Sequence, residues 1–430
     1  MDHHDLLLRG GNIVDPASGL SGESDIAVRG GVISAVGDLR GHSASQDIDV
    51  SGYLVTPGLV DIHTHVYPRL PYTSDCLPCL PPDVPALSNG VTSIVDAGTC
   101  GETDFPAFYE DIIQRSKVRI YALINISRYG MLYLAKESRC ASFYPSHVAE
   151  IARAYAGVVV GIKSAHYRTS PPFDSTHPAW ASVDAALEAG SMATLPVMLD
   201  VFPVCPERSY PDLLAHMRPG DIHAHVFAPH IPGLDCQGRV ADWMWEARER
   251  GVLFDMAHGG KSFCFTHAVP AVNQGFYPDS ISSDLYMSSA LDSSISLPHV
   301  MSKCLAMGMP LDEVVLRSTY RPAQMLNLPD TGSLKTGARA DIAVFKIMSE
   351  PLGFTDAFNL RLPADRYLNC RMTVLAGDVV YNPYGLGCAA FPENPERLRD
   401  ENRAVDFTPR KPEAQGKPIH PKVSHDSWQH

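Results

Sequence analysis

Two histidines, His63 and His65, stand one residue apart at the end of the apolar stretch 58–65. Imidazole nitrogens are common ligands of divalent metal ions. Because residues two apart on a strand point to the same side, both rings can face one ion. A lone histidine at a strand end is more often a core or loop residue, so the metal assignment depends on further ligands elsewhere in the chain.

Further polar residues stand at the ends of other short apolar stretches. These residues are Asp96, Asn125, Lys163, Asp200, His223, His225, His258 and Asp284. Histidine nitrogens and carboxylate oxygens suit Zn²⁺, Mn²⁺ or Fe²⁺. If the strand ends meet on one face, the sequence predicts a metal centre on that face.

The apolar stretches have the length and composition of strands that are buried on both faces. They occupy residues 58–65, 91–98, 119–126, 158–165, 194–200, 221–227, 252–258 and 280–285. Helical patterns separate most of them, as at 106–117, 146–157 and 240–251. Eight such strands alternating with helices predict an α/β fold of the (β/α)8 TIM barrel type, whose site lies at the carboxyl ends of the strands.

The two ends of the chain have a different pattern. Alternating apolar stretches broken by glycine pairs indicate hairpins near both termini. We therefore predict a small β-sandwich domain built from residues 1–56 and 336–388, and a barrel of residues 57–335. Residues 389–430 are rich in proline and charge, which predicts a C-terminal tail that is loosely ordered or wraps a neighbouring surface.

The composition is that of a globular enzyme with more than one domain. Of 430 residues, 45% are hydrophobic and 19% are charged. The net charge of -13 argues against nucleic acid and anionic membranes as partners. No apolar run reaches about 18 residues, and the N-terminus lacks a signal-peptide pattern. We expect a cytoplasmic protein with a small-molecule substrate.

Ten cysteines are spread thinly along the chain, most of them in apolar settings such as that of Cys264. This distribution favours a reducing compartment over a disulfide framework. Cys76 and Cys79 form one CxxC motif. A lone CxxC is a weak indication of zinc or redox chemistry, and a plain loop is the expected interpretation.

Lys163 and Asp284 have the most reactive settings. Lys163 ends a fully apolar strand, where burial lowers the pKa of its amine. A neutral amine can add carbon dioxide and become a carbamate that bridges two metal ions; alternatively, the lysine forms a salt bridge with Asp200 or Asp284. Asp284 can bind the metal and also accept a proton from metal-bound water, whose pKa the ion lowers towards 7. Metal-bound hydroxide with a Lewis acid predicts a hydrolase of amide, ester or cyclic amide bonds.

These motifs together resemble the amidohydrolase superfamily, and within it the dihydroorotase-like amidohydrolase/deacetylase branch of metallohydrolases. The motifs are PGLVDIHTH at 57–65, GVTSIVDAG at 90–98, RPGDIHAHVF at 218–227, ISSDL at 281–285 and GSLKTGARADIAVF at 332–345. The resemblance runs from about residue 5 to 385. It implies a barrel with a β-sandwich made from both termini, and one or two divalent ions, zinc first with Mn or Fe as alternatives.

The resemblance also implies which residues bind the metal ions. His63, His65 and Asp284 would bind the more buried ion. Carboxylated Lys163 would bridge the two ions, and His225 would bind the second. His225 is favoured over His223 because the family motif ends in Thr-His-Cys-Phe where this chain has Ala-His-Val-Phe.

Asp200 departs from the family pattern, in which a histidine commonly ends the fifth strand. A carboxylate at this position can still ligate a metal. It can instead hydrogen-bond a neighbouring ligand and leave one metal only. We therefore count Asp200 among the expected ligands and leave the number of ions open.

The remaining site residues are expected on loops that follow the strands. Catalysis is assigned to Asp284, Lys163 and His258, and substrate binding to Tyr67, Arg128, His166, Arg168 and Lys261. Arginine suits bidentate pairing with a substrate carboxylate. His258 precedes two glycines, which let backbone approach a ligand.

Three functions follow from this pattern. The leading hypothesis is a metal-dependent hydrolase of a small amide or ester, such as an N-acyl amino acid or an acylated hydroxy acid. The alternative enzyme opens a ring, as a dihydroorotase or hydantoinase does. A non-catalytic barrel scaffold is the third, because Asp200 departs from the usual ligand set. A homo-oligomer is expected by analogy with similar barrels alone.

Overall fold

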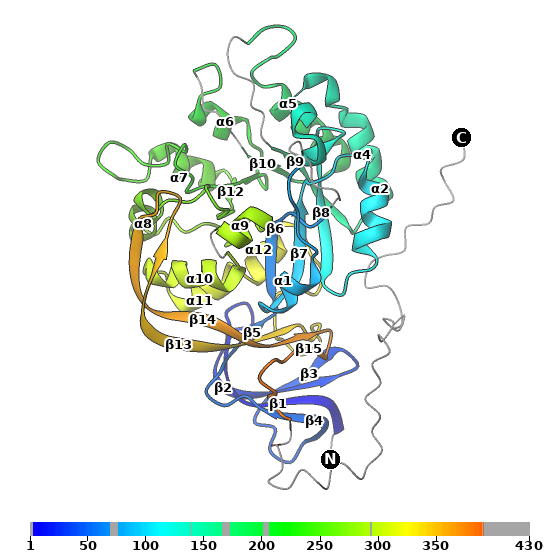
Figure 1. Cartoon of the computed structure of the whole chain (residues 1–430), viewed down its shortest axis with the longest axis vertical. Coiled ribbons are helices and arrows are strands. Elements are labelled where there is room, and N and C mark those ends of the chain that lie inside the picture. The colour runs from blue at the N-terminus through cyan, green and yellow to red at the C-terminus, as the bar shows by residue number, and fades with distance from the viewer. Residues whose placement is uncertain are drawn as a thin grey trace, which may run out of the picture.

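The computed structural model describes residues 3–68, 76–137, 139–165, 173–200, 206–292, 295–388 and 390. These residues form two sheets. A seven-stranded parallel sheet lies at the centre of the upper part of Figure 1, and an eight-stranded sheet lies below it.

The parallel sheet runs in chain order from its first strand to its last. Its strands are β6 (Leu59–Thr64), β7 (Val91–Ala97), β8 (Arg119–Asn125), β9 (Val159–Ser164), β10 (Val197–Leu199), β11 (Ile222–His223) and β12 (Leu253–Phe254). Every residue of β6, β7, β8 and β9 is buried. Burial on both faces explains why these strands are apolar throughout. Seven of the eight predicted strands are thereby confirmed.

The segment 280–285, predicted as the eighth strand, is not a strand, and the prediction is corrected here. Ser280 forms a single parallel bridge with Asp255, directly after β12, and Leu285 forms one with Thr64 of β6. The segment therefore still lies between the last and the first strand, where the ring closes. The ladder is interrupted because the backbone N–H of Ser283 donates to the Asp61 carboxylate instead of a carbonyl. Asp284 also has a left-handed φ of 49°, which turns the chain out of a strand.

The last three strands are shorter than predicted. Strands β10, β11 and β12 have three, two and two residues. His225 and Ala257, which follow β11 and β12, have left-handed φ angles of 58° and 41°. A left-handed residue cannot continue a ladder. The polar side chains at these strand ends are therefore placed by turns.

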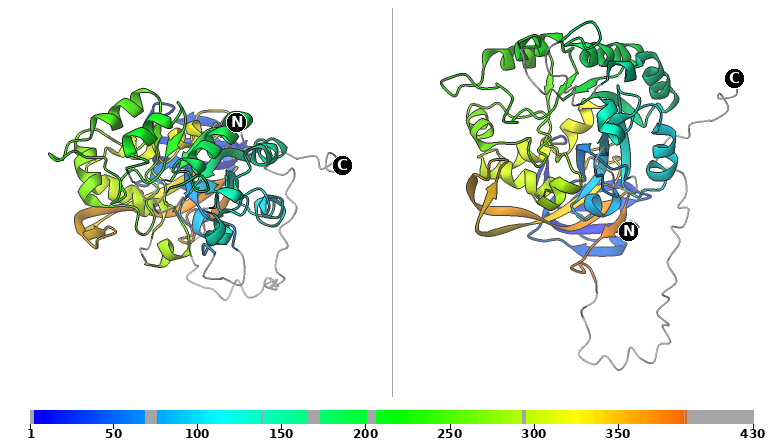
Figure 2. Two further views of the ribbon diagram at one scale, coloured as in Figure 1. Left: turned by 90° about the horizontal axis from the view of Figure 1, so that it is seen from above. Right: turned by 45° about the horizontal axis from the view of Figure 1, so that its top comes forward.

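Helices surround the parallel sheet, as the two views of Figure 2 show. They are α1 (Asp83–Leu87), α2 (Phe105–Phe108), α3 (Leu134–Glu137), α4 (Pro145–Ala154), α5 (Ala181–Ala193), α6 (Tyr210–His216), α7 (Asp242–Glu249), α8 (Phe265–Asn273), α9 (Met287–Asp292), α10 (Leu297–Ala306), α11 (Leu311–Leu316) and α12 (Tyr320–Met325). The helices predicted at 106–117, 146–157 and 240–251 correspond to α2 with the π-helical turn η1 (Tyr109–Ile113), α4 and α7. Inside the barrel, side chains such as Val60, Val95 and Met198 pack with Met325 of α12.

Strands from both ends of the chain share the second sheet. They are β1 (His3–Asp15), β2 (Leu20–Arg29), β3 (Val32–Gly37), β4 (Ser43–Asp49), β5 (Leu54–Pro57), β13 (Ile342–Thr355), β14 (Arg361–Leu375) and β15 (Asp378–Tyr381). β5 joins the two halves, because it pairs with β1 on one side and β13 on the other. The long strands β13 and β14 reach up beside α10 (Figure 1). The sandwich form of this unit and the domain bounds stay predictions.

The predicted tail, 389–430, lies outside the described residues apart from residue 390. Among the helices that the structure describes, none has the length and apolar composition needed to cross a membrane.

Candidate metal centre

Three of the predicted ligands converge at the carboxyl end of β6. The donor atoms of His63, His65 and Asp284 all lie within 4.8 Å of one another, and all three residues are buried. Nε2 of His65 lies 3.3 Å from Oδ1 of Asp284, and Nε2 of His63 lies 3.9 Å from the same oxygen. Ligand atoms around a tetrahedral zinc ion lie about 3.4 Å apart. These spacings fit one bound ion.

His225 and Asp200 form a second pair beside this group. Nε2 of His225 lies 3.3 Å from Oδ2 of Asp200, and the rings of His225 and His63 are 5.1 Å apart. Nζ of Lys163 lies 3.2 Å from Nε2 of His63. The structure therefore brings all six predicted ligands to one place, where His63 lies beside both Lys163 and His225.

The imidazole of His63 is oriented by a carboxylate that the sequence analysis did not identify. Nδ1 of His63 lies 3.1 Å from Oδ2 of Asp255. The other oxygen of Asp255 accepts hydrogen bonds from the hydroxyls of Ser280 and Ser282. Since a carboxylate only accepts, Nδ1 of His63 carries the proton and Nε2 presents its lone pair to the group.

His65 is oriented by a hydroxyl. The Thr99 hydroxyl donates its only proton to Oδ2 of Asp96 over 2.7 Å, and backbone N–H groups also donate to Asp96. The Thr99 oxygen must therefore accept from Nδ1 of His65, 2.9 Å away. This directs Nε2 of His65 at Oδ1 of Asp284, 3.3 Å away.

His225 is oriented by backbone. Its Nδ1 lies 2.7 Å from the carbonyl oxygen of Ala257, which can only accept. All three histidines therefore hold Nδ1–H against an acceptor and present Nε2 to the same centre. Such outer partners are typical of metal-binding histidines. The donor set and its orientation fit one or two divalent metal ions.

Burial lowers the pKa of Lys163, against the charges of Asp200, Asp284 and Asp255. The neutral amine is the form that can add carbon dioxide. Gly98, directly after β7, makes room for this lysine. A Cβ at Gly98 would lie 2.6 Å from the Cβ of Lys163. Gly98 also has a φ of 82°, which favours glycine.

Acidic groups set the charge of the histidines and of their surroundings. Burial would lower the pKa of His225, but the Asp200 carboxylate raises it to about 9. Burial raises the pKa of Asp255 to about 6. It also raises the pKa of Asp61, two residues before His63 on β6, to about 7. A divalent cation at the same donors favours neutral imidazole and charged carboxylate.

His223, the histidine that the family comparison disfavoured, lies away from the centre. Its ring packs against Tyr210 and Phe254, between the sheet and the helices. Within the described part of the chain, neither of its ring nitrogens has a hydrogen-bond partner. Burial lowers its pKa to about 3. His225 is thus the residue of this pair that faces Asp200.

His258, predicted to act in catalysis, uses both ring nitrogens within the protein. Nδ1 donates to the Gly259 carbonyl over 2.7 Å, and Nε2 accepts from Nζ of Lys303 over 3.0 Å. Burial and the Lys303 charge hold the pKa of His258 well below its usual range. Gly259, beside it, lies against Asp284, since a Cβ there would meet Oδ2 at 2.3 Å. The catalytic role of His258 stays a prediction.

The predicted substrate-binding residues differ in how far they are exposed. Tyr67 is buried against Phe108. The side chain of Arg128 is 36% exposed, and its Nε lies 3.3 Å from Glu102. Lys261 is exposed after β12. His166 and Arg168 lie outside the described residues, and all five assignments stay predictions.

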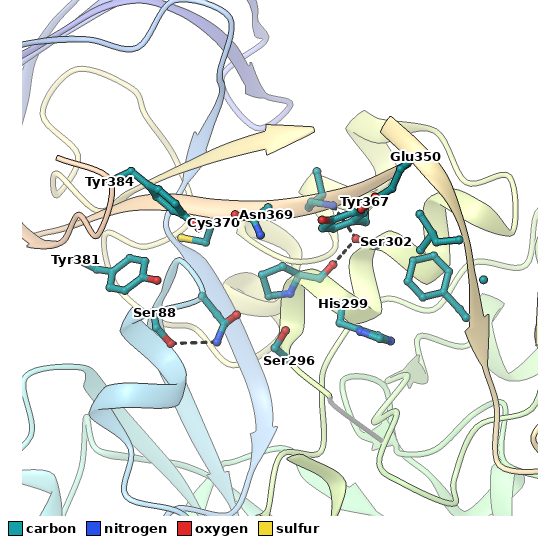
Figure 3. Close-up of a pocket in the computed structure, with 16 residues that line it drawn as sticks. Ser88, Ser296, His299, Ser302, Glu350, Tyr367, Asn369, Cys370, Tyr381 and Tyr384 are labelled. Atoms are coloured by element: carbon teal, nitrogen blue, oxygen red, sulfur yellow. Dashed lines mark hydrogen bonds between the residues drawn. The ribbon is translucent and has the colours of Figure 1, made fainter. Parts of the chain in front are cut away.

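A cavity lies elsewhere in the molecule. It has a volume of about 520 Å³ and lies between α10 and the strands β13 and β14. Ser296, His299 and Ser302 face Tyr367 and Asn369 across it (Figure 3). None of the predicted site residues lines it. The metal centre is therefore identified by its donors and not by this cavity.

Sequence reasoning missed Asp255, Thr99 and the role of Asp96. Asp255 is a polar residue inside the apolar stretch 252–258, which was the available indication. Nothing local marked Thr99 as a partner of His65, because the contact joins two different strand ends.

Comparison with known proteins supports this assignment. A model of the protein family described as "Amidohydrolase family" matches residues 301–381. A deacetylase of Enterococcus faecalis is 28% identical over 383 residues, 88% of this chain and 100% of that protein. A deacetylase of Agrobacterium fabrum is 31% identical over 346 residues, 78% of this chain and 81% of that protein.

Two solved structures resemble the whole described fold. A crystal structure of an adenine deaminase matches with a TM-score of 0.78 and 28% identity, over 88% of this chain and 100% of that one. A dihydroorotase structure matches with a TM-score of 0.74 and 26% identity, over 88% and 97% of the two chains. The barrel, the oriented histidines and these similarities lead to one conclusion: the chain belongs to the amidohydrolase superfamily, in its dihydroorotase-like amidohydrolase/deacetylase branch.

Proposed function

We propose that the chain is a metal-dependent hydrolase that cleaves the amide or ester bond of a small molecule, such as an N-acyl amino acid or an acylated hydroxy acid. One observation carries the proposal: His63, His65 and His225 each hold Nδ1 against an acceptor and direct Nε2 at one buried centre that also holds Asp284. The two deacetylase relatives support an acylated substrate.

The ligands divide into two subsets. His63, His65 and Asp284 would hold one ion, and His225 and Asp200 would hold a second. Lys163, once carboxylated, would be a ligand of both. When bound, a divalent cation supplies a Lewis acid and makes water more acidic.

Asp284 is the group placed to move the proton. Its side chain is 10% exposed, and Oδ1 faces the histidines. The carboxylate accepts the proton of the attacking water and returns it to the leaving nitrogen or oxygen, as a general base and then a general acid. Burial of the surrounding side chains strengthens the electrostatic interactions within the centre.

The test combines metal analysis with a substrate panel. Protein prepared with Zn²⁺ and bicarbonate is analysed for metal per chain and then assayed on N-acetyl amino acids and acylated hydroxy acids. We expect one or two ions per chain and turnover of at least one substrate class. Asp284→Asn should lose activity by about 10²- to 10⁴-fold, as expected for loss of a general acid–base group.

Asp111→Asn is the matched control, because the Asp111 side chain is 62% exposed. It should keep the activity of the parent protein. Failure of metal-replete protein on the whole panel, or unchanged activity in Asp284→Asn, contradicts the proposal.

A ring-opening activity is the second candidate, favoured by the dihydroorotase neighbour. Loss of ultraviolet absorbance from dihydroorotate, dihydropyrimidines or hydantoins would assign the centre to cyclic amides. Absence of bound metal under all conditions would favour the non-catalytic scaffold.

A further inference from the structure

The CxxC motif, treated above as a plain loop, lies against the metal centre. The Sγ atoms of Cys76 and Cys79 lie 3.4 Å and 3.3 Å from the same carbonyl oxygen, that of Leu77. The two sulfurs are therefore less than about 7 Å apart, and rotation of the side chains must bring them to the S–S bond length of about 2 Å. In the structure both residues are thiols.

The two thiols differ in access. Cys76 is partly exposed, whereas Cys79 is 0% exposed. Burial raises the pKa of the Cys79 thiol well above its usual value. A soluble oxidant therefore meets Cys76 first, and Cys79 is placed to react with the oxidised sulfur from inside.

The segment that carries the motif is bonded to both sides of the metal centre. Directly after Cys79, the backbone N–H of Leu80 donates to the carbonyl of His65 over 3.2 Å. Directly before Cys79, the carbonyl of Pro78 accepts from the N–H of Met287 over 2.9 Å, three residues after Asp284. A change in the backbone between Cys76 and Cys79 is thus transmitted to the segments that carry two metal ligands.

Cys79 also contacts the group that orients His65. The side chain of Thr99 interacts with the Cys79 sulfur, and Thr99 is the acceptor for Nδ1 of His65. Drawing the Cys79 sulfur towards Cys76 removes it from Thr99. The thiol pair therefore has a second route to the metal centre.

We propose that Cys76 and Cys79 form a reversible disulfide in response to hydroperoxides, and that closing this bond lowers the activity of the metal centre. The Cys76 sulfur attacks a peroxide oxygen, the O–O bond breaks, and Cys76 becomes a sulfenic acid with release of water. The Cys79 sulfur then attacks the Cys76 sulfur, the S–S bond forms, and a second water leaves. Two thiols lose two electrons and two protons, and one hydrogen peroxide becomes two waters. The effect on activity rests on the proposed function, but the bond does not.

The experiment treats the metal-loaded protein with hydrogen peroxide, alkylates the remaining thiols and maps the peptide that contains residues 76–79 by mass. Metal content and activity on the substrate found above are measured on the same samples. We expect the 76–79 disulfide, loss of bound metal, and a fall in kcat/KM of about tenfold or more, the size seen when partners of metal ligands are changed. Dithiothreitol should reverse all three changes.

Cys76→Ser should have the parent activity and should resist peroxide, while Cys236→Ser, which removes an exposed cysteine, should respond like the parent. If peroxide inactivates the protein while Cys76 and Cys79 are both still alkylated as free thiols, the proposal is overturned. It is also overturned by a disulfide that leaves metal content and activity unchanged, or by a Cys76→Ser protein that peroxide inactivates reversibly. The peptide map and the metal content are measured without a substrate. A protein that cleaves none of the tested substrates can therefore still show whether the disulfide forms and releases metal.

Discussion

Nδ1 of His63 lies 3.1 Å from Oδ2 of Asp255, although the two residues are 192 positions apart in the chain. This contact decides which nitrogen of His63 faces the metal centre. The serine hydroxyls on the other oxygen of Asp255 keep the carboxylate in place. The orientation of a predicted metal ligand on the first barrel strand thus depends on a residue that directly follows the last strand of the parallel sheet.

Asp255→Asn should weaken metal binding. An amide cannot offer acceptors both to His63 and to the two serine hydroxyls, so one contact is lost. We expect metal affinity to fall about 10- to 100-fold, measured by competition with a chelator. Asp111→Asn, an exposed acid, is the control. Equal affinities in the two variants would contradict the role of Asp255.

Thr99→Val should affect His65 in the same way. The valine has a similar shape but no oxygen to accept from Nδ1 of His65. Metal occupancy and kcat should both fall, while Thr99→Ser, which keeps the hydroxyl, should retain most of both. If valine and serine behave alike, the hydroxyl does not orient His65.

Gly98→Ala should inactivate the protein through Lys163, whose Cβ would lie 2.6 Å from the new methyl group. Gly308 is the matched control, because its φ of 98° is also left-handed but a Cβ there meets nothing within 4 Å. Both alanine variants should lose stability by about 1 kcal/mol from backbone strain. Only Gly98→Ala should also lose metal content and activity. Equal activity in the two variants would contradict the packing argument.

The pKa of His225 predicts how stability of metal-stripped protein depends on pH. The folded pKa of about 9 lies above the unfolded value of 6.5. The protonated imidazole beside Asp200 therefore contributes stability that is fully present below pH 6.5 and is lost as pH rises through 9. Urea unfolding of chelated protein at these two pH values measures the change.

Asp200→Asn removes the charge that raises the pKa of His225, so the variant should lose this part of the pH dependence. An unchanged pH profile would show that another group is responsible. Below pH 9, metal binding to His225 must displace a proton, so metal affinity should rise with pH up to that value.

The first four barrel strands could be predicted within a residue or two because they are buried on both faces and must be apolar. The strands ending near Asp200, His225 and His258 were predicted too long. Their apolar residues are almost all buried, but left-handed residues lie inside the predicted stretches: Thr194 before β10, His225 after β11 and Ala257 after β12. Apolar patterns report burial, and they do not report where the backbone leaves the sheet.

Local residue patterns were sufficient to predict the succession of the barrel strands and the polar residues at their ends, because burial restricts each strand to apolar residues and leaves polar ones mainly where the strand ends. Contacts between distant parts of the chain place His225 beside Asp200 and His223 against Tyr210. Such contacts also bring Asp255 and Thr99 to the imidazoles of His63 and His65. These outcomes depend on left-handed turns and on partners from distant strands. Such contacts exist only once the barrel has closed, so no local pattern of residues records them.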